Sequence, residues 1–176
     1  MTQNRAKFKP IYFERSEQMI RSYEAGRCDA ISSDRSQLHV LQSVMSQPDA
    51  HIILDQIISK EPLSPVVRDD DVDFFKVVRW VILATIQAEE WGLNKENYLS
   101  MSRENPDIQQ FLGMTKNAAS AIGLPQRFAA QIITQVGNYG VIYTRNLGEN
   151  SSISIKREHN ALWTTPNGLM YAMPSR

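Results

Sequence analysis

The strongest constraint on the fold is the segment from Val72 to Trp91, which is apolar around most of a helical circumference. A helix with this pattern is buried on more than one side. Aspartates cluster at its start, where carboxylates interact favourably with the helix dipole; they are Asp69, Asp70, Asp71 and Asp73. The segment therefore predicts a buried helix with an acidic first turn.

Residues 1–57 alternate short extended and helical signals. The strand candidates are Phe8–Phe13, Asp29–Ser33 and His51–Leu54. One helix candidate begins at Ser16 and ends at Gly26, and a second has Leu38, Leu41, Val44 and Met45 on one face. Strands that alternate with helices are typical of a layered α/β unit.

Residues 58–68 contain Pro62 and Pro65 and lack a helical period, which predicts an extended connector between two lobes. Residues 69–176 are mostly helical in pattern. We expect short helices over 94–102 and 105–113, and one longer helix from Pro125 to Gly148. Gly137 and Gly140 lie inside that longer helix, where each costs about 1 kcal/mol against Ala, so close packing is expected there. The tail 162–176 is irregular and rich in large apolar residues, so it should pack back onto the helices.

The composition excludes several classes of function. Lys and Arg together number 19, as do Asp and Glu, so the net charge gives no support to binding nucleic acid or an anionic membrane. No apolar run is long enough to span a bilayer. The first residues also lack the apolar core of a signal peptide, so we expect the chain as written to stay in the cytoplasm.

The sequence offers no metal centre and no catalytic group. His39, His51 and His159 lack metal-ligand spacing, and the single cysteine, Cys28, is expected to be a buried apolar residue. The D-x-D-x-D opening at Asp69 resembles a calcium loop but lacks the glycine and glutamate that such a loop needs. Glu89 and its neighbour Glu90 point in different directions on a helix, so they do not form a paired-carboxylate site. We therefore expect no cofactor.

Asp34 follows a strand candidate and precedes a helix candidate. It has the place of an N-cap, with Gln37 three residues on to complete a capping box. The same junction is where ligands of α/β sheets bind, beyond the carboxyl end of a strand. A carboxylate there can pair with a ligand ammonium group through charge-assisted hydrogen bonds. The two interpretations are compatible and both remain open.

Four stretches, in order and at matching spacing, resemble one protein family. They are AGRCDAISSDRSQL at 25–38, IISKEPLSPVVR at 57–68, VGNYGVIYTRNLGENS at 136–151 and NALWTTPNGLMYAMPSR at 160–176. The family is that of the general L-amino-acid-binding proteins of polar amino-acid ABC importers. The resemblance covers the C-terminal half of such a protein.

This resemblance implies a partial two-lobed, type II periplasmic-binding-protein-like clamshell. Residues 1–57 would be part of the second α/β lobe, 58–68 the connector, and 69–176 a helical part that packs on the first lobe. It implies that Asp34 binds the α-ammonium group of an L-amino acid and that Ser33 adds a hydroxyl contact. It also implies a periplasmic location and ABC permease subunits as partners.

The first-lobe sheet and its carboxylate-clamping arginine are missing from the pattern. We therefore expect the isolated chain to bind amino acids weakly or not at all, because half a site does not enclose a small polar ligand. We also expect it to be marginally stable alone, or to associate with a complementary N-terminal half. Two alternatives remain: an interaction module that binds no ligand, and a dehydratase on the same fold, which would need an acid–base pair that is not visible.

Overall fold

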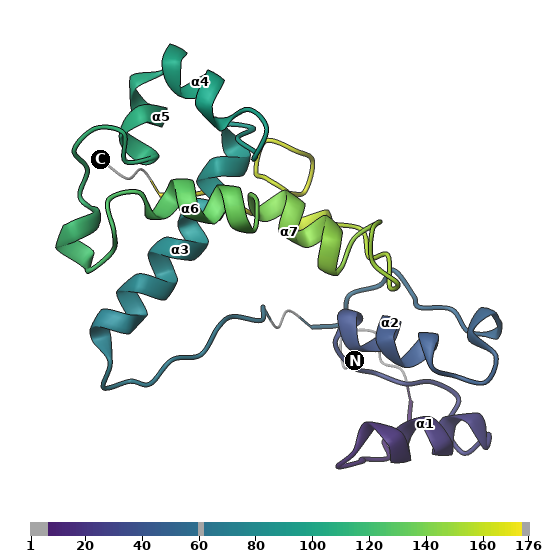
Figure 1. The fold of residues 1–176 in the computed structure, drawn as a ribbon. Coiled ribbons are helices and arrows are strands. Elements are labelled where there is room, and N and C mark those ends of the chain that lie inside the picture. Colours follow the sequence, from purple (N-terminus) through teal and green to yellow (C-terminus); the bar gives the residue numbers. More distant parts are fainter. Residues whose placement is uncertain (1–6, 60–61, 174–176) are drawn as a thin grey trace. The chain divides into compact units, whose positions relative to one another are not determined.

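The structure is a computed structural model that describes residues 7–59 and 62–173. The chain divides into two compact units, Met1–Leu63 and Ser64–Arg176. The division falls inside the segment 58–68 that the sequence predicts as a connector. Each unit is described below by itself (Figure 1).

The first unit contains the helices α1 (Ser16–Glu24) and α2 (Arg35–Ser43) and a short 3-10 helix η2 (Pro48–Ala50), joined by long loops. Both predicted helices are confirmed, and α1 is followed by Gly26 at φ +70°, a left-handed conformation that favours glycine. Polar contacts connect α1 to the loop after α2. Tyr23 Oη lies 3.0 Å from His51 Nδ1, and Glu24 Oε1 accepts hydrogen bonds from the backbone N–H and the hydroxyl of Ser46, both at 2.9 Å.

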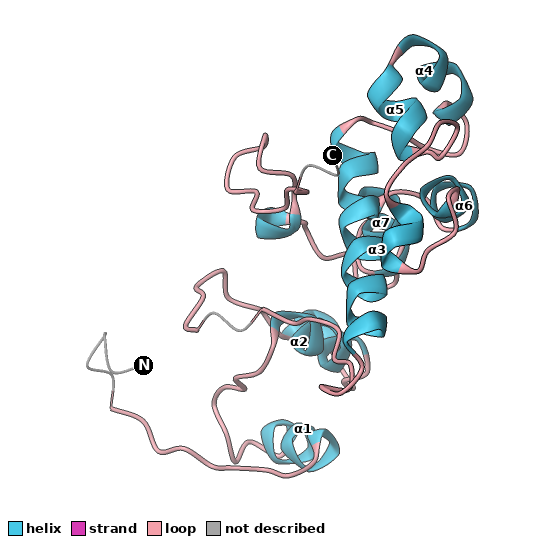
Figure 2. Cartoon of the chain, turned by 90° about the vertical axis from the view of Figure 1, so that its left-hand side faces the viewer, coloured by secondary structure: helices cyan, strands magenta, loops and turns pink. Residues whose placement is uncertain are grey.

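The predicted strands of this unit are wrong. None of the residues described over 7–59 belongs to a strand, and Figure 2 shows loops at all three candidate segments. A strand exists only when its backbone pairs with a neighbour, and these segments have no such neighbour in the described chain. Their apolar side chains are left uncovered, with Ile52 85% and Leu54 70% exposed.

Burial in the first unit is correspondingly slight. Leu41 and Met45 are its buried apolar residues among those described. Cys28 is only half-buried and carries a free thiol, so the expectation that it is a buried core residue is wrong. A unit with so little buried apolar surface gains little hydrophobic stabilisation.

The second unit is a helical assembly around α3 (Val72–Glu90). Helices α6 (Phe128–Gln135) and α7 (Tyr139–Asn146) pack against α3, as does the 3-10 helix η3 (Ala119–Ile122). Helices α4 (Tyr98–Glu104) and α5 (Pro106–Phe111) pack against each other, and the short η4 (Glu158–Asn160) precedes the tail (Figure 1). The core is formed by Ala84, Ala88, Leu93, Ile108, Phe111, Leu112, Ala129, Ala130 and Ile133.

The predicted central helix is confirmed, but its burial is uneven. The Asp71 side chain caps α3 by accepting a hydrogen bond from Phe74 N at 2.9 Å. The consecutive residues Ala84, Thr85 and Ile86 are all buried, so the second half of α3 is covered on more than one side. The first half is not: Phe74 is 52% exposed.

The single long helix predicted from Pro125 to Gly148 is wrong. The chain forms two helices there, α6 and α7, because Gly137 adopts φ +88° and interrupts the helical backbone. Asn138 then caps α7 by accepting from Val141 N at 2.9 Å. An asparagine directly after a glycine supplies a stop signal and a start signal, which the apolar periodicity concealed.

The tail packs back onto the helices, as predicted. The Trp163 indole N–H donates to Glu90 Oε1 at 3.0 Å, and Ala172 N donates to the same oxygen at 3.2 Å. Within the tail, Leu162 and Met170 form an isolated parallel bridge. Gly168 permits this approach, because a Cβ atom there would lie 2.0 Å from the Leu162 carbonyl oxygen. Among the described residues, no helix is long and apolar enough to cross a membrane.

Candidate functional site

Asp34 immediately precedes α2, in the N-cap position that the sequence predicts. Its side chain makes no capping hydrogen bond, so the predicted position is right but the predicted capping bond is not formed. The carboxylate is exposed, and no donor to it is found among the described residues. It still benefits from the partial positive charge at the helix N-terminus. The first unit therefore presents an acceptor group that its own structure does not use.

The predicted capping box is also wrong, because Gln37 is engaged elsewhere. Its Oε1 atom accepts a hydrogen bond from the Ser33 hydroxyl, and its Nε2 atom donates to Ser16 Oγ at 3.0 Å. The Gln37 side chain thus connects the residue before Asp34 to the start of α1. The structure brings Ser33 and Asp34 to the same junction, where the Ser33 hydroxyl donates to Gln37 and keeps its capacity to accept a hydrogen bond.

The charges around α2 leave Asp34 without a competing partner. Its neighbour Arg35 forms an ion pair with Asp55 at 3.5 Å, across to the loop that follows η2. Burial and the nearby Arg35 charge lower the pKa of His39, which favours a neutral imidazole in the middle of α2. A carboxylate in this setting can accept two or more hydrogen bonds from an ammonium group.

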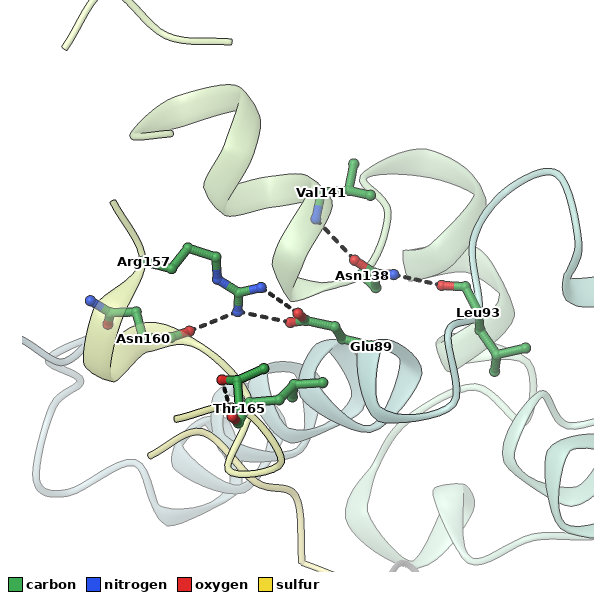
Figure 3. Close-up of polar contacts among 8 residues, drawn as sticks. Glu89, Leu93, Asn138, Val141, Arg157, Asn160 and Thr165 are labelled. Carbon is green, nitrogen blue, oxygen red and sulfur yellow. Dashed lines mark hydrogen bonds and ion pairs between the residues drawn. The ribbon is translucent and has the colours of Figure 1, made fainter. Parts of the chain in front are cut away.

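A polar network in the second unit was not predicted from the sequence. Arg157 forms an ion pair with Glu89 of α3, in which NH2 donates to Glu89 Oε2 at 3.0 Å and NH1 donates to Oε1 (Figure 3). The same guanidinium lies 5.5 Å from the ring centre of Tyr139 and donates to Asn160 O at 2.7 Å. Because both charged side chains are mostly buried, this network is a structural connection between α3, α7 and η4.

Asn138 adds a second buried link. Its side-chain NH2 donates to the Leu93 carbonyl oxygen at 2.8 Å while its oxygen caps α7, so one amide connects the end of the α3 region to α7 (Figure 3). Burial raises the pKa of the neighbouring Tyr139. The expectation of close packing at Gly140 is confirmed, since a Cβ atom there would lie 2.8 Å from Glu89 Oε1. This glycine was the only sequence signal for the network.

Glu89 and Glu90 act separately, as their adjacent positions predict. Glu89 binds Arg157, whereas Glu90 accepts from Trp163 and Ala172 of the tail. No group of His, Cys, Asp or Glu side chains within 7–59 or 62–173 could hold a metal ion. Two cavities, of about 710 and 120 Å³, lie in the second unit, and neither is lined by Asp34 or Ser33.

No protein-family model matches the chain. It is 43% identical over 176 residues to the general L-amino acid-binding periplasmic protein AapJ of Rhizobium johnstonii, covering 98% of this chain and 51% of AapJ. It is 37% identical over 175 residues to the glutamate/glutamine/aspartate/asparagine-binding protein BztA of Rhodobacter capsulatus, covering 98% of this chain and 52% of BztA. The chain is homologous to amino-acid-binding proteins of ABC transporters.

A solved structure agrees with this relationship. An ABC transporter periplasmic binding protein from Brucella ovis, with glutathione bound, superposes with a TM-score of 0.90 at 39% sequence identity. The match covers 99% of this chain and 55% of the Brucella protein. The chain spans about half the length of the curated relatives it matches. Its own fold is helix-rich over the described residues.

Proposed function

We propose that the chain is the C-terminal half of an amino-acid-binding component of an ABC importer, in which Asp34 accepts the α-ammonium group of the ligand. The observation that carries this proposal is the structural likeness to the Brucella binding protein over 99% of the chain, at 39% identity. The names of AapJ and BztA support amino acids as the ligand class.

The geometry at Asp34 supports the role assigned to it. The carboxylate is exposed, makes no hydrogen bond that capping would require, and lies at the positive end of α2. An ammonium group is a cation with hydrogen-bond donors, so it would form short charge-assisted bonds to the two carboxylate oxygens. The Ser33 hydroxyl, which donates to Gln37, lies beside Asp34 and would add a contact to the ligand.

The rest of such a site must hold the ligand carboxylate, and we assign that task to the half of the relatives that this chain does not match. A small polar ligand needs enclosure on most sides for affinity. The chain by itself would therefore bind amino acids weakly. The uncovered apolar residues Ile52 and Leu54 support a partner surface on the first unit, which a complementary half would cover.

A chimera tests this proposal directly. The unmatched half of AapJ is fused ahead of this chain, and binding of a panel of L-amino acids is measured by isothermal titration calorimetry. We expect the chimera to bind at least one amino acid. Asp34→Asn should weaken binding by a factor of 100 or more, as expected for roughly 3 kcal/mol from one lost buried charge partner. Asp49→Asn, which alters another exposed carboxylate of the first unit, is the matched control and should have little effect.

Two results would contradict the proposal. Unchanged affinity in the Asp34→Asn chimera would show that Asp34 does not accept the ammonium group. Micromolar binding by the unfused chain would show that this chain does not need the other half to bind an amino acid. We further propose that the whole protein acts in the periplasm and delivers its ligand to ABC permease subunits, which the names of the relatives support. Release of the full-length protein from cells by osmotic shock, with the cytoplasmic proteins retained, would test its location.

A further inference from the structure

The larger cavity of the second unit has a wall of aromatic side chains. It has a volume of about 710 Å³ and lies where the end of α3, helix α5 and the tail meet. Trp91 and Phe111 form one side in an edge-to-face pair, with ring centres 5.2 Å apart and an interplanar angle of 82°. Trp163 and Tyr171 also line the cavity and are 61% and 62% exposed. Large aromatic faces are therefore available to a ligand.

The charged groups in the same cavity are negative. Glu90 and Asp107 line it, and no described lining residue is a lysine, arginine or histidine. Glu90 Oε2 accepts one hydrogen bond, from Gln87 at 3.1 Å, so it retains capacity for another donor. Asp107 is exposed, and no described residue donates to its carboxylate. Electrostatics in this cavity therefore oppose an anion and favour a cation.

We propose that this cavity binds a small organic cation that carries an apolar group, such as an arylalkylammonium ion. The ammonium group would lie between the carboxylates of Glu90 and Asp107, and the apolar part would pack against the aromatic walls. Aromatic faces attract cations as well as apolar groups, so both parts of the ligand gain from the same wall. This inference does not depend on amino-acid capture at Asp34.

The test uses the full chain, labelled so that NMR resolves the indole N–H signals of its three tryptophans. The labelled chain is titrated with 2-phenylethylammonium chloride. The indole signals of Trp91 and Trp163 should shift in a saturable way. Trp80 lines only the smaller cavity and is the internal control, so its signal should stay in place. The neutral analogue 2-phenylethanol should bind at least two-fold more weakly, because it lacks the charge.

Asp107→Asn should weaken binding of the ammonium probe roughly two- to five-fold, as expected for an exposed charge pair, and leave 2-phenylethanol unaffected. Glu104→Gln removes an equal charge from a nearby residue that does not line the cavity and should change little. Equal affinity for the two probes, or unchanged affinity in Asp107→Asn, would overturn the proposal. Three coincident indole signals would overturn it as well, because the cavity would then not be formed.

Discussion

Glu89 occupies the space that a side chain at position 140 would need: a Cβ atom built on Gly140 would lie 2.8 Å from Glu89 Oε1 and 3.1 Å from Arg157 NH1. The ion pair between Glu89 and Arg157 therefore depends on Gly140, although Gly140 forms no polar contact with either side chain. An added Cβ would therefore require the Glu89 and Arg157 side chains to move.

Gly140→Ala should destabilise the chain, although alanine favours a helix by about 1 kcal/mol over glycine. The added methyl displaces the Glu89 carboxylate and breaks its two bonds to Arg157. The expected net loss is about 1–2 kcal/mol, measured by urea unfolding. The Glu89→Ala background is the control, because there the same substitution meets no carboxylate and should be neutral or stabilising. A loss of equal size in both backgrounds would contradict the steric explanation.

Glu89→Gln should lower the free energy of unfolding by about 1–3 kcal/mol, because it leaves the mostly buried Arg157 charge uncompensated. The comparison is Asp70→Asn, which removes the partner of Arg68. The side chains of Arg68 and Asp70 are 80% and 62% exposed, so that change should cost less than about 0.5 kcal/mol. Similar effects of the two substitutions in urea unfolding would show that burial does not govern the Glu89 pair.

Substitution of the two N-cap residues Asp34 and Asn138 should affect stability to very different extents. Asp34→Ala should leave the melting temperature nearly unchanged, because its side chain makes no capping bond. Asn138→Ala should cost about 1–3 kcal/mol, because it removes the cap on Val141 and leaves the buried Leu93 carbonyl without its donor. Thermal unfolding followed by circular dichroism measures both. A clear loss of stability in Asp34→Ala would mean that the carboxylate is occupied within the fold and not available to a ligand.

The contact between Glu24 and Ser46 should make the first unit sensitive to acid. Hydrogen bonds from the Ser46 backbone N–H and hydroxyl lower the pKa of Glu24 in the folded chain. A lowered folded-state pKa means that the contribution is present above the unfolded-state pKa and disappears as the pH falls through the folded-state value. The protection of the Ser46 amide, measured relative to its intrinsic exchange rate at each pH, should therefore fall at acidic pH, and Glu24→Gln should remove that pH dependence of the protection. An exchange profile unaffected by Glu24→Gln would exclude this contact as the cause.

The uncovered apolar surface should make the isolated chain associate. Phe74 and Phe75 at the start of α3 are 52% and 49% exposed, and Ile52 is 85% exposed. Such side chains favour contact with another chain over contact with water. We expect size-exclusion chromatography to give a concentration-dependent elution volume, and Phe74→Ser with Phe75→Ser to reduce that dependence. A compact monomer that unfolds cooperatively would contradict this expectation.

The helices could be predicted from the sequence because their signals are local. The apolar pattern of α3 and the stop at Gly26 both lie within a few residues of the structure they determine. The strand candidates failed because a strand needs a pairing partner, and none is present beside His51–Leu54 in the described chain. The break at Gly137 was missed because the apolar periodicity continues across it.

The candidate site was only partly predictable. The position of Asp34 before a helix follows from its neighbours, but the role of Gln37 depends on Ser16, which is distant in the sequence and reached only through the fold. The Glu89–Arg157 pair joins residues still farther apart, and only the neighbouring glycine indicated close packing. Contacts of this kind have no periodic signature, so a single sequence does not identify them.

One oxygen atom of Glu90 accepts hydrogen bonds from both the Trp163 indole N–H and the Ala172 backbone N–H. The segment between these two residues is therefore a loop whose two ends bind the same carboxylate. A protease that cuts this loop between the two donors, for example beside Asn167, would leave the segments on both sides of the cut bound to the same helix. The nicked chain would then keep its helical assembly and reveal the cut only under denaturing conditions. We therefore expect a cut in the segment 164–168 to leave both new ends held at α3 through Glu90.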